Sequence, residues 1–309
     1  MNNRRRILGL GLSVIFLAGL FSLVDSSRFV AVLLRVHLPT YAVAVTLFTS
    51  TYLLVALRWQ VLARAVDIDL TLSESTEITA LSYGINKLLP ANAGDLARSK
   101  ITDEYTTVES HSELLGLVVV ERLADLCTIC LVVCVGIPLV FDSSFLSVVA
   151  VSALAVAAIA SLLVFDVGER VRSVALLPAS LQSALDRALS AMDSVTGFQL
   201  WFIFGTSVVR WLLIAGVFVV LATSVGLSVP FVTAAMVTAA MSLTATLPLS
   251  PGGIGPVDAV GTGMLVVSGF ASAEALSLVV LQRSLGLGLM ALVGFVIYNY
   301  RLWFPPEPS

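Results

Sequence analysis

The sequence places charged side chains inside segments that are otherwise apolar. Glu121, Arg122 and Asp125 lie several residues inside one such segment, and Arg210 and Arg283 lie inside two others. A charged side chain at the centre of a membrane helix costs about 2.5–3.5 kcal/mol on insertion scales, so by default it marks a functional pathway. Arginine forks match phosphate oxygens, and a carboxylate can pair with them or take up a proton. The chemistry expected from these residues is the binding of an anion.

The composition indicates where this chemistry takes place. The chain has 309 residues, of which 58% are hydrophobic and 12% are charged, and its mean hydropathy is +1.00. Soluble domains average about 25% charged residues, so the chain is expected to be an integral membrane protein. Its formal net charge of −3 provides no basic surface for nucleic acid. No metal site or cofactor is expected, because nothing completes a set of metal ligands around the cysteines and histidines.

Apolar segments long enough to cross a bilayer need about 20 residues. About six occur, near residues 7–24, 41–62, 113–140, 145–165, 197–225 and 273–298. Between the expected spans at 145–165 and 197–225, residues 170–193 carry apolar side chains at helical spacing, with charged residues largely between them. This pattern predicts an amphipathic helix that lies in the membrane interface.

Two further apolar regions are interrupted by prolines and glycines. Residues 72–108 break at "LLPANAGD", which begins at Leu88, and residues 229–270 break at "LPLSPGGIGPVDAV", which begins at Leu247. Arginine-rich short loops predict that the N-terminus and the C-terminus are both cytoplasmic. Both termini can be cytoplasmic only if each broken region enters and leaves the membrane on the same side. Each broken region is therefore expected to be a re-entrant hairpin. The alternative is an ordinary pair of helices joined by a tight turn.

The two halves of the chain share an order of features at similar spacing, which predicts an internal duplication. An odd number of spans between the halves would insert the second one upside down. Inverted repeats with paired broken helices are typical of secondary transporters, whose substrate sites lie near the bilayer midplane. The recurring pairs are Arg58-Trp59 and Arg210-Trp211, Leu89-Pro90 and Leu247-Pro248, and Glu121-Arg122 and Gln282-Arg283.

The predicted fold is therefore an all-α polytopic membrane protein. It has about six full transmembrane helices and two re-entrant broken-helix hairpins, arranged as inverted repeats. Residues 1–309 are expected to form a single membrane domain in the cytoplasmic membrane. Its parts are an N-terminal span and outer loop at 1–40, repeat one at 41–140, a linking span and the amphipathic helix at 141–196, and repeat two at 197–309.

The tip of each hairpin is a candidate anion site. The helix that begins at a tip leaves its first backbone N–H groups unpaired, and such groups bind anions. Glycines let the backbone approach a ligand closely, and Pro256 suits the first turn of a new helix. The residues expected to contribute are Asn92 and Gly94 in the first tip and Ser250, Gly252, Gly253 and Gly255 in the second.

The charged residues complete the expected site. Arg98, Arg122 and Arg210 are expected to neutralise the anion. Glu121, Asp125 and Asp258 are expected either to couple a proton or to pair with the arginines when the site is empty. A purely structural network that holds the repeats together is the alternative. The expected substrate-binding residues are Arg58, Asn86, Asn92, Gly94, Asp95, Arg98, Arg122, Arg210, Ser250, Gly252, Gly253, Gly255 and Arg283.

Four stretches together resemble the lysylphosphatidylglycerol synthase transmembrane-region family, often called flippase-like, over most of the chain. They are "LRWQVL", "NKLLPANAGDLARS", "VVVERLADL" and "LPLSPGGIGPVDA". Members of the family stand alone or are fused to an aminoacyl-transfer or glycosyltransferase domain, and this chain looks like a stand-alone member. In the family pattern an arginine often stands at the position of Asn92 and a glutamate at that of Asp258, whereas Arg98 matches the pattern.

The resemblance implies that the protein moves a lipid head group across the bilayer. The predicted function is a lipid translocase for an anionic phospholipid or a polyprenyl-phosphate-linked sugar, with proton coupling and a partner synthase or glycosyltransferase as further expectations. One alternative is a membrane-embedded transferase in which Asp95 or Glu121 serves as the base. Others are an accessory subunit for lipid-linked glycan or aminoacyl-lipid synthesis, and a small-ion channel.

Overall fold

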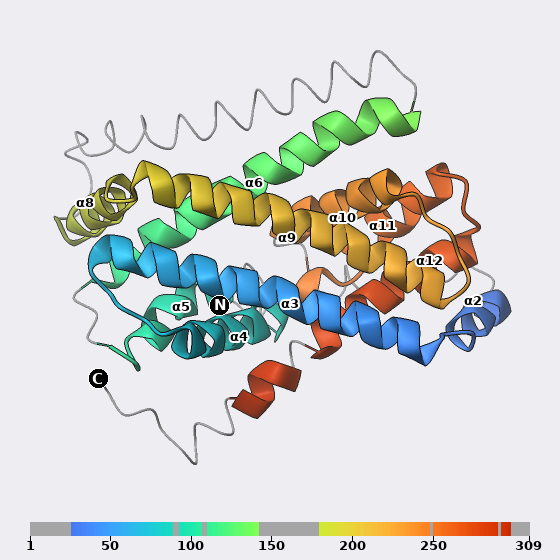
Figure 1. The fold of residues 1–309 in the computed structure, drawn as a ribbon, viewed down its shortest axis with the longest axis horizontal. Helices are drawn as coiled ribbons and strands as arrows, with labels where there is room; N and C mark the ends of the chain where they lie inside the picture. The colour runs from blue at the N-terminus through green and yellow to red at the C-terminus, as the bar shows by residue number, and fades with distance from the viewer. Residues whose placement is uncertain are drawn as a thin grey trace. The chain divides into compact units, whose positions relative to one another are not determined.

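Every regular element among the described residues of this computed structural model is a helix, which confirms the predicted all-α class. The structure describes residues 26–88, 93–106, 110–141, 179–247, 250–289 and 292–297 (Figure 1). The spans predicted at 7–24 and 145–165 lie outside these residues, as do Pro90, Asn92 and Pro248. The number of full spans and the inverted repeat therefore stay predictions.

Three long helices match predicted spans. They are α3 (Leu38–Ala63), α6 (His111–Phe141) and α9 (Gly197–Ser224). A 3-10 turn continues α3, and the segments Leu38–Val66 and Gly197–Ser224 are long and apolar enough to cross a membrane. At 1.5 Å per residue, the 26 residues of α3 extend about 39 Å, more than the roughly 30 Å of a hydrocarbon core.

The helices of the two broken regions are short, and they end where the sequence predicts. The first region gives α4 (Leu72–Leu88) and α5 (Ala93–Thr102), and the second gives α10 (Phe231–Thr246) and α11 (Pro256–Val267). Their lengths are 17, 10, 16 and 12 residues, below the roughly 20 that a full span requires. These lengths suit half-helices, while the re-entrant path through a membrane stays a prediction.

Two features of local structure were not predicted. Residues within the expected outer loop form helix α2 (Ser26–Leu33), which packs against α12 (Ser272–Arg283). The span predicted at 273–298 is not one continuous α-helix, because a π-helix, η3 (Ser284–Leu289), follows α12. Tertiary packing stabilises α2, while two glycines in "SLGLGL" lower the propensity for the regular α-helix that would continue α12.

The chain divides into two compact units, and α3, α4, α5 and α9 supply residues to both. Unit 1 comprises residues 1–51, 83–93 and 211–295, and unit 2 comprises residues 52–82, 94–210 and 296–309. Within unit 1, α10 packs against α11, α11 against α12, and α12 against α2 (Figure 1). A 3-10 turn, η2 (Pro251–Gly253), lies in the loop between α10 and α11.

Within unit 2, the amphipathic helix is packed on protein. It is confirmed as α8 (Ala179–Asp193) over the described part of 170–193, and it packs against α6. A Cβ at Gly116 of α6 would lie 2.1 Å from the carbonyl oxygen of Ala188, so only glycine permits this approach. Leu189 and Met192 of α8 are buried. The apolar face therefore contacts other helices, and the location of α8 in a membrane interface stays a prediction.

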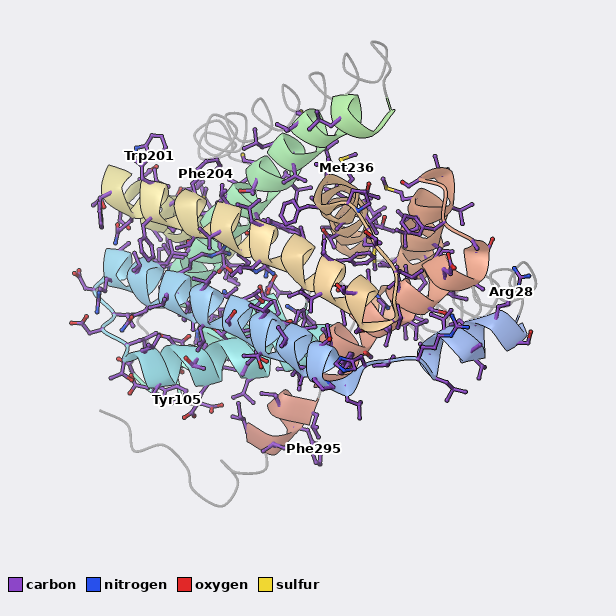
Figure 2. All side chains as sticks on the ribbon, turned by 45° about the vertical axis from the view of Figure 1, so that its right-hand side comes forward. Arg28, Tyr105, Trp201, Phe204, Met236 and Phe295 are labelled. Atoms are coloured by element: carbon purple, nitrogen blue, oxygen red, sulfur yellow. The ribbon has the colours of Figure 1, made fainter. Side chains whose placement is uncertain are left out.

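Large apolar side chains lie exposed on the long helices. Phe198 is 79% exposed and Trp201 is 76% exposed on α9, and Leu38 at the start of α3 is 74% exposed. Figure 2 shows Trp201 pointing away from the helix bundle near the N-terminal end of α9. Exposed apolar surface of this kind is unfavourable in water and suits lipid, and tryptophan near a span end suits the membrane interface.

Candidate functional site

A cluster of arginines and carboxylates lies in unit 2, built from α3, α5, α6 and α9. Helical spacing brings its members together, because residues three or four apart share a helix face. Glu121 and Asp125 of α6 stand four residues apart, and Ser207 and Arg210 of α9 stand three apart. We call this set the arginine cluster: Arg58, Asp95, Arg98, Glu121, Arg122, Asp125, Ser207 and Arg210.

Glu121 holds the buried core of the arginine cluster. Its Oε1 accepts a hydrogen bond from Arg58 Nη2 at 2.6 Å, and its Oε2 accepts one from Arg98 Nη1 at 2.6 Å. All three side chains are 0% exposed. Arg98 also lies over the ring of Trp59. A buried charge is tolerated when it is paired and hydrogen-bonded on every side, and both oxygens of Glu121 meet this condition.

Asp125 joins the buried core to α9. Its Oδ1 accepts hydrogen bonds from Arg58 Nη1 at 2.8 Å and from Ser207 Oγ at 2.9 Å. The Ser207 hydroxyl in turn accepts a hydrogen bond from Arg58 Nη1 at 2.7 Å. The other oxygen, Oδ2, lies 3.4 Å from Arg210 Nη1 and 3.7 Å from Arg122 Nη1. Arg122 and Arg210 therefore flank a single carboxylate oxygen.

Arg122 binds Asp95 through two parallel hydrogen bonds. Arg122 Nε donates to Asp95 Oδ2 at 2.8 Å, and Nη2 donates to Oδ1 at 2.7 Å. Asp95 lies in the first turn of α5, where a negative charge is stabilised by the helix dipole. The side chain of Arg122 is 35% exposed and that of Asp95 is 8% exposed. The fork of Arg122 is thus occupied by a carboxylate at the edge of the cluster.

The arginine cluster carries an excess of positive charge. Among the described residues it contains four arginines and three carboxylates, which gives a net charge of +1 when all are ionised. Arg58 and Arg98 are 0% exposed, whereas Arg210 is 12% and Arg122 is 35% exposed. The excess charge is therefore accessible at Arg122 and Arg210.

A second set of predicted residues forms the loop before α11 in unit 1. Gly252, Gly253 and Gly255 have φ angles of 60°, 67° and 93°, which explains why glycine stands at these positions. The Ser250 hydroxyl donates to the carbonyl of Ile254 at 2.7 Å, within the loop. These contacts give the glycines a conformational role in the loop, in addition to the ligand contact that the sequence predicted.

Asp258 and Arg283 hold this loop together. Asp258 Oδ2 accepts a hydrogen bond from the Gly255 N–H at 2.8 Å, and Oδ1 lies 3.1 Å from Arg283 Nε. Arg283 Nη2 donates to the carbonyl of Gly252 at 2.8 Å. Pro256 opens α11, as predicted. At the tip where an external anion was expected, the carboxylate of Asp258 already accepts the Gly255 N–H.

The two sites share one local arrangement. Asp95 is the third residue of α5 and Asp258 is the third residue of α11, and each pairs with an arginine of a later helix, Arg122 or Arg283. An internal duplication would produce this recurrence. The halves differ in chemistry, however, because Gln282 precedes Arg283 where Glu121 precedes Arg122.

Comparison with known proteins identifies the family. The family model described as "Lysylphosphatidylglycerol synthase TM region" matches residues 6–294. The chain belongs to this family. No curated protein matches the chain. Membership of the lysylphosphatidylglycerol synthase TM-region family, together with the apolar helices, makes the chain a helical membrane protein with a function related to membrane lipids.

Most of the predicted site residues of this family member lie in one of the two sites. Gly94 is buried beside Asp95, whereas Asn86 is half-buried in α4 within unit 1, and Asn92 lies outside the described residues. Sequence reasoning missed Ser207, although its spacing from Arg210 places both on one face of α9. Among the described residues, no group of three or more His, Cys, Asp or Glu side chains could hold a metal ion.

Proposed function

We propose that the protein is a translocase for an anionic membrane lipid and that the lipid phosphate binds at Arg122 and Arg210. The observation that supports this proposal is the charge distribution of the arginine cluster. Its positive excess lies at the two arginines that are partly exposed and that flank Asp125 Oδ2. The more deeply buried Arg58 and Arg98 bind Glu121 and organise the site.

The energetics of the bilayer favour an anionic ligand at this position. Arginines in apolar surroundings stabilise a neighbouring anion, so the excess of arginines over carboxylates among the described residues of the cluster favours an anionic ligand. The arginine fork matches the geometry of phosphate oxygens. Candidate head groups are a modified phosphatidylglycerol and a polyprenyl-phosphate-linked sugar. The acyl or prenyl tails would remain in lipid while the head group crosses, and alternating exposure of the cluster would provide the two states.

The contacts of the carboxylates favour transport over transfer chemistry. A transferase needs an accessible base, and Asp95 and Glu121 were the candidates. Glu121 is 0% exposed and bound by two arginines, and Asp95 is held by both nitrogens of the Arg122 fork. Both carboxylates therefore serve as ion-pair partners in the proposed mechanism, and neither is positioned as a free base.

Translocation in proteoliposomes tests the proposal. The full chain is reconstituted with fluorescent phosphatidylglycerol or a fluorescent polyprenyl phosphate, and a membrane-impermeant quencher reports the lipid in the outer leaflet. The native protein is expected to accelerate exchange between leaflets for one of these lipids. Arg122→Gln is expected to abolish this acceleration. Arg187→Gln, at an exposed position of α8 outside the arginine cluster, is the control and is expected to retain it.

Two outcomes would contradict the proposal. If the native protein moves neither lipid, translocation by this chain fails as its function. If Arg122→Gln and Arg187→Gln behave alike, the phosphate does not bind at the arginine cluster. Mass spectrometry of the recovered lipids separates transport from transfer, because a transferase would release a covalently changed lipid.

A further inference from the structure

Arg122 combines accessibility with a bidentate ion pair. It is the most exposed arginine of the arginine cluster, with 35% of its side chain accessible, and its Nε–Nη2 edge is nevertheless occupied by Asp95. We propose that Asp95 is a built-in placeholder for the lipid phosphate. It occupies the fork of Arg122 in the empty site, and the phosphate displaces it. This inference rests on the proposed function.

The geometry makes the carboxylate and the phosphate competitors. Asp95 uses Nε and Nη2 of Arg122, which form one edge of the guanidinium. A phosphate that binds in the same bidentate manner needs two adjacent N–H groups, and this edge offers them in the arrangement that phosphate prefers. One edge holds one bidentate partner, so a phosphate that takes the Nε–Nη2 edge exchanges with the carboxylate.

A displaced Asp95 has a cationic neighbour ready. Arg98 stands three residues later on α5, and its Nη2 lies 3.9 Å from Asp95 Oδ1. A small rotation of the Asp95 side chain towards Arg98 would strengthen that ion pair as the contact with Arg122 is lost. The carboxylate would then remain paired throughout the exchange, which avoids the large penalty of an isolated buried charge.

The placeholder has a consequence for lipid transport. When only a fraction of the sites is ready to bind a ligand, the observed affinity equals the intrinsic affinity multiplied by that fraction. Asp95 reduces that fraction, so the lipid binds more weakly than to an open arginine fork. It also returns to Arg122 as the lipid leaves, which promotes release. A carrier needs both steps, because a phosphate held permanently by two arginines would not cross.

Asp258 provides a natural contrast at the same position of α11. It pairs with Arg283, but its second oxygen is bound by the Gly255 N–H, and Arg283 is also bound to the Gly252 carbonyl. The Arg283 side chain is only 14% exposed. Asp258 is therefore fixed from two sides and closes a loop, whereas Asp95 binds Arg122 at an accessible edge of the arginine cluster. Only Asp95 is expected to exchange with a ligand.

Binding measurements on the purified full chain in detergent test the placeholder. The probes are short-chain phosphatidylglycerol, sn-glycerol 3-phosphate as a tail-free arm, and inorganic sulfate as a reference anion, each titrated by calorimetry. Asp95→Asn keeps a hydrogen-bond acceptor for Arg122 but removes the competing charge. It is expected to bind phosphatidylglycerol roughly tenfold more tightly than the native chain, which corresponds to about 1.4 kcal/mol. Arg122→Gln, alone or combined with Asp95→Asn, is expected to abolish binding.

The control is Asp258→Asn, which removes the equivalent charge from α11 and is expected to give no gain in affinity. A gain in Asp95→Asn for phosphatidylglycerol supports the placeholder. If sn-glycerol 3-phosphate shows the same gain, the phosphate alone is recognised, and if it does not, the lipid tails contribute. Thermal unfolding in detergent checks each variant, and Asp95→Ser replaces Asp95→Asn if the latter does not fold.

The two proposals fail in different ways. If Asp95→Asn binds phosphatidylglycerol no more tightly than the native chain while Arg122→Gln still abolishes binding, the placeholder is wrong and the phosphate site stands. If Arg122→Gln leaves binding unchanged, the phosphate site itself is wrong and the placeholder fails with it. An equal gain in Asp95→Asn and Asp258→Asn would indicate a general effect of charge and would overturn the placeholder.

Discussion

The guanidinium carbon of Arg98 lies 4.8 Å from the centroid of the Trp59 ring. Both side chains are 0% exposed, so water does not compete for the contact. A cation over an indole face is attracted by the electron-rich ring, by about 2 kcal/mol when both groups are desolvated. The aromatic face therefore holds Arg98 in the position from which it binds Glu121.

Replacing Trp59 should destabilise the protein more when the aromatic face is lost than when it is kept. Trp59→Leu removes the aromatic face and leaves a cavity, so we expect a loss of about 2 kcal/mol or more in the free energy of unfolding. Trp59→Phe keeps an aromatic face and should cost less. Chemical unfolding in detergent measures both. Equal losses for the two variants would show that the cation–π contact contributes little.

Removing the charge of Glu121 should be strongly destabilising. Glu121→Gln leaves Arg58 and Arg98 buried without their shared carboxylate, and breaking a buried ion pair costs about 3–5 kcal/mol. Glu113→Gln, in the first turn of the same helix and outside the arginine cluster, is the control and should change stability by about 0.5 kcal/mol or less. Thermal unfolding in detergent compares them. Similar midpoints for both variants would contradict the assigned role of Glu121.

A side chain at Gly255 should strain the loop before α11. Gly255 has φ 93° and ψ −71°, a conformation that residues with a Cβ strongly disfavour. Gly255→Ala is therefore expected to lower stability by about 1–3 kcal/mol. Gly263→Ala, at a position of α11 where a Cβ meets nothing within 4 Å, should leave stability unchanged or slightly raised. A Gly255→Ala variant as stable as Gly263→Ala would argue against this loop conformation.

A large side chain at Gly116 should separate α8 from α6. Gly116→Leu places atoms where the backbone of Ala188 now lies, and the clash is with backbone that cannot rotate away. Trypsin cleavage after Arg187, an exposed residue of α8, should become faster as the helix is released. Gly205→Leu, where a Cβ would meet nothing within 4 Å, is the matched control. Unchanged cleavage in Gly116→Leu would show that α8 is held by other contacts.

The sequence was a good guide to which residues matter and a poor guide to how they pair. Charged residues in apolar segments must find partners, so Arg58, Glu121 and Asp125 could be assigned to one site from their types and positions in the chain. Their pairing depends on the side-by-side placement of helices distant in sequence, which local patterns do not contain. The sequence therefore left open whether Glu121 served a ligand, a proton or other arginines.

In the fold, too, local features were predictable from the sequence and features that depend on tertiary packing were not. Helix breaks at "LLPANAGD" and "LPLSPGGIGP" were predictable, because proline and glycine disfavour helix through local geometry. Helix α2 was missed because its stability comes from packing on α12 rather than from its own eight residues. The π-helix after Arg283 was also missed, since apolar periodicity over six residues does not distinguish i→i+5 from i→i+4 hydrogen bonding.

The arrangement of the arginine cluster also imposes an order on biosynthesis. Arg58 and Glu121 are 63 residues apart, and Arg210 follows Asp125 by 85 residues. When the ribosome has completed α3, the carboxylates that neutralise Arg58 have not yet been made, and a lone arginine costs up to about 2.5–3.5 kcal/mol to insert, the value for the centre of a span. The later arrival of α6 is therefore expected to stabilise the integration of α3, and the cluster is complete only after α9 has been made.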